Sequence, residues 1–173
     1  MDHLDLPLKP AEGNLDARNL RFGIVVSKFN ESVTSRLETS ALETLRQHKA
    51  RESAIQLVRV PGAFEIPLVA RYLARSGHFD AVLCLGAVIR GKTPHFDFIS
   101  AEMSRGISQA SWDTGIPVVF GVLTTNTLEE AQARAGGTGI NRGVDTARVA
   151  IEMATLMKTL HDLDRTGWRT SLS

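Results

Sequence analysis

The fold can be inferred first from the segment DAVLCLGAVIRGKTPHF, residues 80–96. Its first ten residues, 80–89, form an almost continuous apolar run, which is typical of a strand buried on both faces of a sheet. Glycine, charged residues and proline then interrupt the run, and a helical pattern follows over 95–115. The stretch therefore predicts a buried strand that ends in a polar turn and leads into a long helix.

The same alternation recurs along the chain. Short apolar runs predict three further strands, at 21–26, 54–60 and 117–123. Helical patterns follow them, at 29–48, 63–77, 128–136 and 141–163. Asn30 is expected to cap the first of these helices. Because the strands are mostly apolar throughout, the pattern favours an α/β fold, a three-layer flavodoxin-like sandwich with a four-stranded parallel sheet.

The two ends of the chain lack such a pattern. Residues 1–20 hold two prolines and a glycine and predict an arm outside the core, with an added strand as an alternative. Residues 21–160 form the predicted domain, and residues 161–173 a frayed tail. The N-terminus does not read as a signal peptide, and no apolar run approaches the ~20 residues of a membrane span. We therefore expect a cytoplasmic protein that binds no membrane.

Composition and charge narrow the classes of function. The formal net charge is +1, so no global field draws the protein to nucleic acid or anionic lipid, and any anion site must be local. The single cysteine, Cys84, lies inside the apolar run and is expected to be a buried core residue. A catalytic thiol is the alternative, but no basic residue adjoins Cys84 to activate it.

Parallel sheets of this kind bind ligands beyond the carboxyl ends of their strands. The segments expected there are SKFN (27–30), VPGAFE (60–65), GAVIRGKTPHF (86–96) and GVLTTN (121–126).

Residues 86–93, GAVIRGKT, match the phosphate-loop pattern of nucleotide-binding proteins. Lys92 would then reach the terminal phosphates, and Thr93 would hold magnesium. Two features argue against a nucleotide: residues 88–89 continue the strand, and no later strand ends in an aspartate suited to magnesium. Residues 91–93 still lie between a strand end and a helix start, where main-chain N–H groups favour an anion. A nucleotide site and a turn with incidental polar residues both stay as alternatives.

Four spaced blocks are more specific than any single motif. They are VPGAFEIP (60–67), GAVIRGKTPHFDF (86–98), PVVFGVLTTNTLEEAQARAG (117–136) and NRGVDTARVAIEM (141–153). In this order they closely resemble the lumazine synthase family, and the likeness runs from about Arg21 to Leu160. The resemblance implies condensation of 5-amino-6-(ribitylamino)uracil with 3,4-dihydroxy-2-butanone 4-phosphate, with no cofactor or metal. It also implies a pentamer with active sites between neighbouring subunits.

The resemblance also assigns residues to the two substrates. The pyrimidine and ribityl side is assigned to Phe29, Ala63, Phe64, Glu65, Ala87, Val88, Ile89, Phe120 and Arg142. The phosphate side is assigned to Gly91, Lys92, Thr93 and Arg134, and Asp145 is expected to hold Arg134 by an ion pair. We place Phe120 at the end of the fourth strand. The resemblance implies that it forms an aromatic wall across a subunit interface, and core packing is the alternative. The alternatives are a hydrophobic plug for Phe29, a solvated surface carboxylate for Glu65 and a helix-surface position for Arg134.

His95 is the residue expected to transfer protons. Imine formation, phosphate elimination and ring closure each move protons near neutral pH, where an imidazole changes its charge. His3 and His161 lie in or near the termini. His48 and His78 precede predicted strands at the opposite end of the sheet. The alternative for His95 is a polar residue at a helix start.

Three positions depart from the family pattern. Pro94 stands where relatives carry threonine or serine, and Arg142 where they carry lysine. Ile140, in the loop GGTGIN (136–141), replaces the glycine of shell-forming relatives, and a β-branched residue disfavours a left-handed backbone. A pentamer is expected, a sixty-subunit icosahedral shell stays open, and riboflavin synthase is a candidate partner. A non-catalytic flavin-binding scaffold on the same fold is the remaining alternative.

Overall fold

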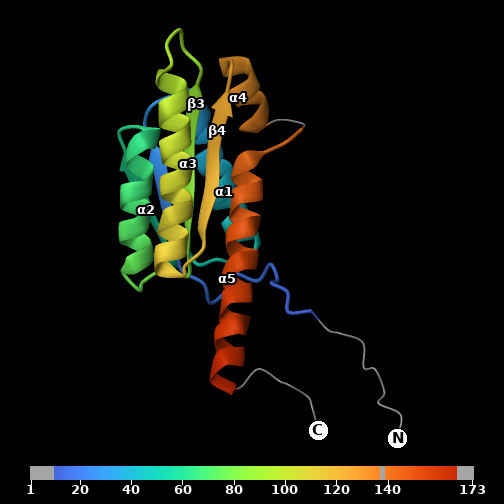
Figure 1. Ribbon diagram of the computed structural model, residues 1–173. Helices are drawn as coiled ribbons and strands as arrows, with labels where there is room; N and C mark the ends of the chain where they lie inside the picture. Colours follow the sequence, from blue (N-terminus) through green and yellow to red (C-terminus); the bar gives the residue numbers. More distant parts are fainter. Residues whose placement is uncertain (1–9, 137–138, 167–173) are drawn as a thin grey trace, which may run out of the picture.

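The computed structural model describes residues 10–136 and 139–166 (Figure 1). The four strands are β1 (Phe22–Ser27), β2 (Ile55–Val60), β3 (Ala81–Ile89) and β4 (Val118–Thr125). The α-helices are α1 (Glu31–Gln47), α2 (Ile66–Arg75), α3 (His95–Thr114), α4 (Leu128–Arg134) and α5 (Arg142–Thr166). Two 3₁₀ turns, Glu52–Ala54 and Ala63–Glu65, precede β2 and α2.

The sheet is parallel throughout, with the strand order β2-β1-β3-β4. Helices α1 and α5 cover one face, and α2 and α3 cover the other (Figure 1). Successive residues of a strand point to opposite faces. Leu83 and Leu85 of β3 accordingly join the core under α1 and α5, and Val82 and Cys84 join the core under α2 and α3. This arrangement confirms the predicted three-layer, flavodoxin-like fold.

Cys84 is fully buried in β3, the strand next to the edge strand β4. Because burial in an apolar setting disfavours the thiolate, the pKa of the Cys84 thiol is raised above its ordinary value. The prediction of a core cysteine is confirmed, and the thiol has neither the exposure nor the charge that catalysis requires.

Asn30 corrects the prediction of a side-chain cap. It does occupy the residue before α1, but its side chain makes no capping hydrogen bond. Its backbone is left-handed (φ 62°, ψ 46°), and its Nδ2 donates instead to the carbonyl oxygen of Ala87, 2.8 Å away. The amide therefore ties the β1–α1 turn to the end of β3.

The predicted bounds of the arm and the tail also need correction. Residues 10–20 contain no strand, and Ala17 and Leu20 are buried in the core against expectation. The Ala17 N–H donates to the carbonyl oxygen of His48, 2.9 Å away, and so anchors this segment at the end of α1. Helix α5 runs on to Thr166, beyond the predicted start of the tail. Residues 1–9 and 167–173 lie outside the described residues.

Gly121 marks a close approach between β4 and α5. A Cβ atom there would lie 2.5 Å from Thr146 Oγ1 and 2.9 Å from the carbonyl oxygen of Cys84. We expect Gly121→Ala to lower the free energy of unfolding by about 1–3 kcal/mol, because the neighbours must shift to admit the methyl group. The measurement is the urea midpoint at one fixed protein concentration.

Gly139→Ala is the matched control, because a Cβ atom there would meet nothing within 4 Å. Its midpoint should equal that of the unchanged protein. Equal midpoints for both variants would contradict the packing described for Gly121.

Candidate active site

A cavity of about 650 Å³ opens beyond the carboxyl ends of β1, β2 and β3. It is lined by Phe29, Asn30, residues 61–65, residues 87–89, Gly91, Thr93, His95, Phe96 and Ile99. Three of the four segments expected at this edge of the sheet therefore converge. The fourth segment, residues 121–126, does not line the cavity. It contacts the start of the loop after β3, because the Arg90 N–H donates to the carbonyl oxygen of Thr125, 2.9 Å away.

The cavity gathers most of the residues predicted for the site and leaves others out. Those that line it are Phe29, Ala63, Phe64, Glu65, Ala87, Val88, Ile89, Gly91, Thr93 and His95. Those that do not are Lys92, Phe120, Arg134, Arg142 and Asp145. The lining residues that sequence reasoning did not assign to a substrate are Asn30, Pro61, Gly62, Phe96 and Ile99. Helical spacing from His95 is the signal that could have found Ile99.

Two aromatic rings stand at the cavity with large exposed faces. The exposed fraction is 72% for Phe29 and 55% for Phe64. The Phe29 N–H donates to the carbonyl oxygen of Pro61, 3.1 Å away, which fixes the turn that carries the ring. Phe29 is therefore not a plug packed into the core, and its ring is available to stack on a planar ligand.

Glu65 is half-buried and held in place. Its Oε2 accepts a hydrogen bond from the Gly62 N–H, 2.9 Å away, across the turn between β2 and α2. A freely solvated surface carboxylate has no such anchor. The arrangement presents the carboxylate to the cavity, where it can accept charge-assisted hydrogen bonds from hydroxyl groups.

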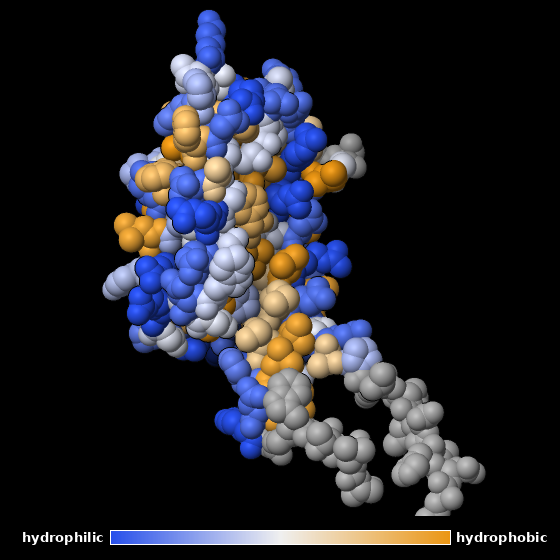
Figure 2. All heavy atoms as spheres, in the orientation of Figure 1, coloured by the Kyte–Doolittle hydropathy of each residue, from blue (hydrophilic) through white to orange (hydrophobic). Residues whose placement is uncertain are grey.

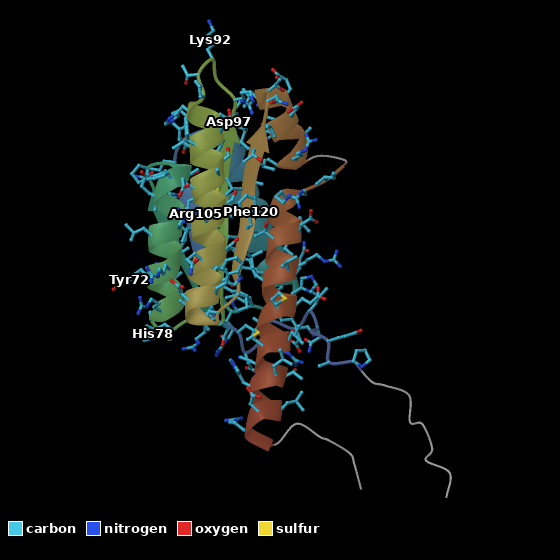
Figure 3. All side chains as sticks on the ribbon, viewed as in Figure 1. Tyr72, His78, Lys92, Asp97, Arg105 and Phe120 are labelled. Atoms are coloured by element: carbon cyan, nitrogen blue, oxygen red, sulfur yellow. The ribbon has the colours of Figure 1, made fainter. Side chains whose placement is uncertain are left out.

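The loop after β3 carries the phosphate-loop motif. Val88 and Ile89 belong to β3, so these two variable residues of the motif continue the strand, as predicted, and do not curl around phosphates. Gly91 and Thr93 line the cavity, whereas Lys92 lies at the tip of the loop and points away from the molecule (Figure 3). His95 is the first residue of α3, where free N–H groups and the helix dipole favour an anion.

The Arg90 side chain, at the start of this loop, is held by several contacts. Its Nη1 and Nη2 donate to the two carboxylate oxygens of Asp97, at 3.1 and 2.8 Å, and its Nε donates to Asn126 Oδ1 at 3.2 Å. The guanidinium carbon also lies 4.2 Å from the centre of the Phe96 ring. Because the guanidinium forms a fork on Asp97, it lowers the pKa of that carboxyl group below its ordinary value.

The Asp97 carboxyl group provides a test of this fork. Its pKa should lie below the ordinary value of 3.8 and return toward it in Arg90→Gln. A carboxyl pKa that is lower in the folded than in the unfolded state stabilises the fold above the unfolded value, and this contribution is lost as pH falls through the folded value. An NMR titration of Asp97 measures both variants. Identical titrations would show that the fork is absent in solution.

The remaining predicted residues lie away from the cavity of their own chain. Arg134 ends α4, is exposed and donates from Nη1 to the carbonyl oxygen of Glu130, 3.0 Å away. Asp145 pairs with Arg142, with 3.8 Å between Nη1 and Oδ2, and not with Arg134. The ion pair between Asp145 and Arg134 therefore stays a prediction.

Phe120 corrects another expectation. It does not end the fourth strand but lies in its first half, opposite Cys84 of β3, and its exposed fraction is 41%. The strand continues to Thr125 because β3 is long enough to pair with it up to Ile89. The ring thus lies partway along the β4 edge and not beside the cavity mouth (Figure 3).

Residues 10–136 and 139–166 hold no group of three histidine, cysteine or acidic side chains placed to bind a metal ion. No helix in the same ranges combines the length and the apolar character needed to cross a bilayer.

Comparison with known protein families gives one match. The model of one family, described as 6,7-dimethyl-8-ribityllumazine synthase, matches residues 19–158 of the 173-residue chain. The match covers all four strands, every segment that lines the cavity, and α5 as far as Lys158.

Proposed function

The chain belongs to the 6,7-dimethyl-8-ribityllumazine synthase family, a family of transferase enzymes, and from this premise we propose its reaction. The chain condenses 5-amino-6-(D-ribitylamino)uracil with 3,4-dihydroxy-2-butanone 4-phosphate. The products are 6,7-dimethyl-8-ribityllumazine, inorganic phosphate and water, in the penultimate step of riboflavin biosynthesis. The observation that carries the proposal is one cavity that brings together an exposed aromatic ring, an anchored carboxylate, a loop of main-chain N–H groups and His95.

The pyrimidine substrate fits the side of the cavity formed by β1, β2 and β3. Phe29 stacks on the ring, because a planar aromatic ligand gains from face contact with an exposed phenyl group. Glu65 accepts hydrogen bonds from the ribityl hydroxyls. Val88 and Ile89 offer main-chain groups and an apolar wall at the end of β3.

The butanone phosphate fits the side formed by the loop after β3. Main-chain N–H groups at Gly91 and Thr93 bind its phosphate at the start of α3. The 5-amino nitrogen of the pyrimidine attacks the ketone carbon, and loss of water gives an imine. Removal of a proton then expels the phosphate and leaves an enol, which becomes a ketone. The ribitylamino nitrogen attacks this ketone carbon, and loss of a second water closes the ring. His95, which lies beside this loop, accepts and returns the protons.

A phosphate in this cavity would meet no lysine or arginine among the described residues that line it. The guanidinium of Arg90 is already occupied by Asp97 and Asn126. The Arg134 guanidinium uses Nη1 for its hydrogen bond to Glu130, so its remaining N–H groups can bind a ligand. We therefore assign to Arg134 of a neighbouring subunit the role of gripping the phosphate.

The surface supports assembly with further copies of the chain. Figure 2 shows apolar residues gathered in a band between α3 and α5, over the edge strand β4. Phe120 lies on this edge, and Phe98 and Trp112 are exposed on α3. An unpaired, apolar strand edge is a surface that proteins normally cover. A homopentamer is the assembly that the family implies, and an icosahedral shell, riboflavin synthase as a partner and a cytoplasmic location stay predictions.

The reaction is tested with the purified chain and its two substrates. Lumazine formation is followed by absorbance, and inorganic phosphate should appear at the same rate. Omitting the butanone phosphate should abolish both signals. Absence of lumazine from an assembled, folded protein would refute the proposed reaction.

The two alternatives predict different results. A nucleotide site would give magnesium-dependent heat of binding with ATP or GTP that Lys92→Ala abolishes. A non-catalytic scaffold would bind flavin tightly without turnover. We expect no heat of binding with either nucleotide, because residues 88–89 are part of β3 and leave no phosphate loop of that kind.

A further inference from the structure

Arg90 occupies a variable position of the phosphate-loop motif, and the proposed reaction assigns it no contact with a substrate. Its side chain does not line the cavity. It instead joins two turns that follow neighbouring strands: the first turn of α3, through Phe96 and Asp97, and the turn after β4, through Asn126. The two residues that it contacts on α3 are the two that directly follow His95.

The loop that Arg90 spans has few other restraints. Residues 91–93 are exposed, and none of the hydrogen bonds found among the described residues involves them. A Cβ atom at Gly91 would meet nothing within 4 Å, so packing does not hold this part of the loop either. Helix α3 itself is held by packing on α2, β4 and the turn at 63–65, with Met103, Ile107 and Ala110 buried. At its first turn, Arg90 adds two hydrogen bonds to Asp97 and a contact with the Phe96 ring.

We propose that Arg90 is a positioning residue that sets the place of His95 in the cavity. The proposal rests on the proposed function, since it concerns the geometry of that reaction. The fork on Asp97 fixes the first turn of α3 in two directions, and the contact with Phe96 fixes the cavity wall next to His95. Both contacts need the planar guanidinium, because a lysine offers a point charge without a fork.

The kinetic test compares Arg90→Ala with Arg90→Lys. Arg90→Ala should lower kcat by about 10- to 100-fold, the size expected for a shift of about 1 Å in a reacting group, and change KM less. Arg90→Lys should not recover the rate. Arg46→Ala is the matched control: Arg46 also forms a fork, on Glu52 at 2.8 and 2.9 Å, but at the opposite end of the sheet. Its kcat should equal that of the unchanged enzyme.

A double variant shows whether Arg90 acts through His95. In the His95→Asn background, adding Arg90→Ala should lower kcat by less than about twofold, because residues that act as a unit are not additive. A full, multiplicative loss would overturn the proposal, as would an unchanged kcat in Arg90→Ala or a full rate in Arg90→Lys. If Arg90→Ala does not fold, Asp97→Asn replaces it, since it weakens the same fork while keeping the side-chain shape.

A second readout separates this proposal from the proposed reaction. If the unchanged protein forms no lumazine, the reaction is refuted, and the positioning role is then decided by amide hydrogen exchange. Arg90→Ala should speed exchange of the Asp97 and Phe98 N–H groups, which donate to the Pro94 carbonyl oxygen at the start of α3, and leave the sheet at the rate of Arg46→Ala. Unchanged exchange of these two N–H groups would overturn the positioning role whatever the substrate is.

Discussion

Replacing His95 with asparagine should lower kcat by about 10²- to 10⁴-fold, the range that a positioned acid–base group contributes. Asparagine keeps the size and the hydrogen-bonding capacity of the side chain but does not take up protons near neutral pH. Because His95 lines the cavity beside the phosphate loop, the loss should appear in kcat, with KM for both substrates within about threefold. Steady-state kinetics with each substrate varied in turn measures both constants.

His78→Asn is the matched control. His78 is exposed and lies at the opposite end of the sheet from the cavity (Figure 3). Its variant should keep the kinetics of the unchanged enzyme. If His95→Asn also kept a normal kcat, proton transfer would belong to another group or to water.

Replacing Arg134 with alanine should raise KM for the butanone phosphate and lower kcat/KM by about 10²-fold or more. A guanidinium fork on a phosphate makes two charge-assisted hydrogen bonds, and each contributes about 1.5–3 kcal/mol. The KM for the pyrimidine, which binds on the other side of the cavity, should change little. Unchanged kinetics with the phosphate substrate would show that the assignment of Arg134 is wrong.

Arg46→Ala also serves as the control for Arg134→Ala. It removes a guanidinium that is bound to Glu52, far from the cavity, and the net charge changes by the same amount. A rise in KM for both variants would indicate a general effect of charge on phosphate binding and not a specific contact.

Much of the fold could be predicted from the sequence, because it depends on local patterns. The apolar run at 80–89 and the helical period after His95 correspond to β3 and α3 within one residue. The predictions that failed depended on tertiary contacts. Ala17 and Leu20 are buried although their segment has no period, and β4 extends to Thr125 because β3 is there to pair with it.

The residues of the site also fall into a group that the sequence predicts and a group that it does not. Residues in the turns that follow β1, β2 and β3 could be predicted to meet, because parallel strands end at one edge of the sheet. The side-chain contact of Asn30 with Ala87 and the network around Arg90 could not, since no spacing in the sequence specifies which acceptor a side chain reaches. Arg134 and Phe120 lie outside the cavity of one chain, and their predicted roles depend on a neighbouring subunit. Arg142 also lies outside this cavity.

His95 of one subunit and Arg134 of its neighbour are proposed to act in one cavity, and an experiment with mixed subunits can detect this shared site. His95→Asn and Arg134→Ala chains, each nearly inactive alone, are co-expressed with different tags and isolated as mixed assemblies. When the two chains are present in equal amounts and assemble at random, about a quarter of the interfaces combine an intact His95 with an intact Arg134. About a quarter of the normal activity should therefore return. Mixed assemblies that recover no activity would contradict the shared site.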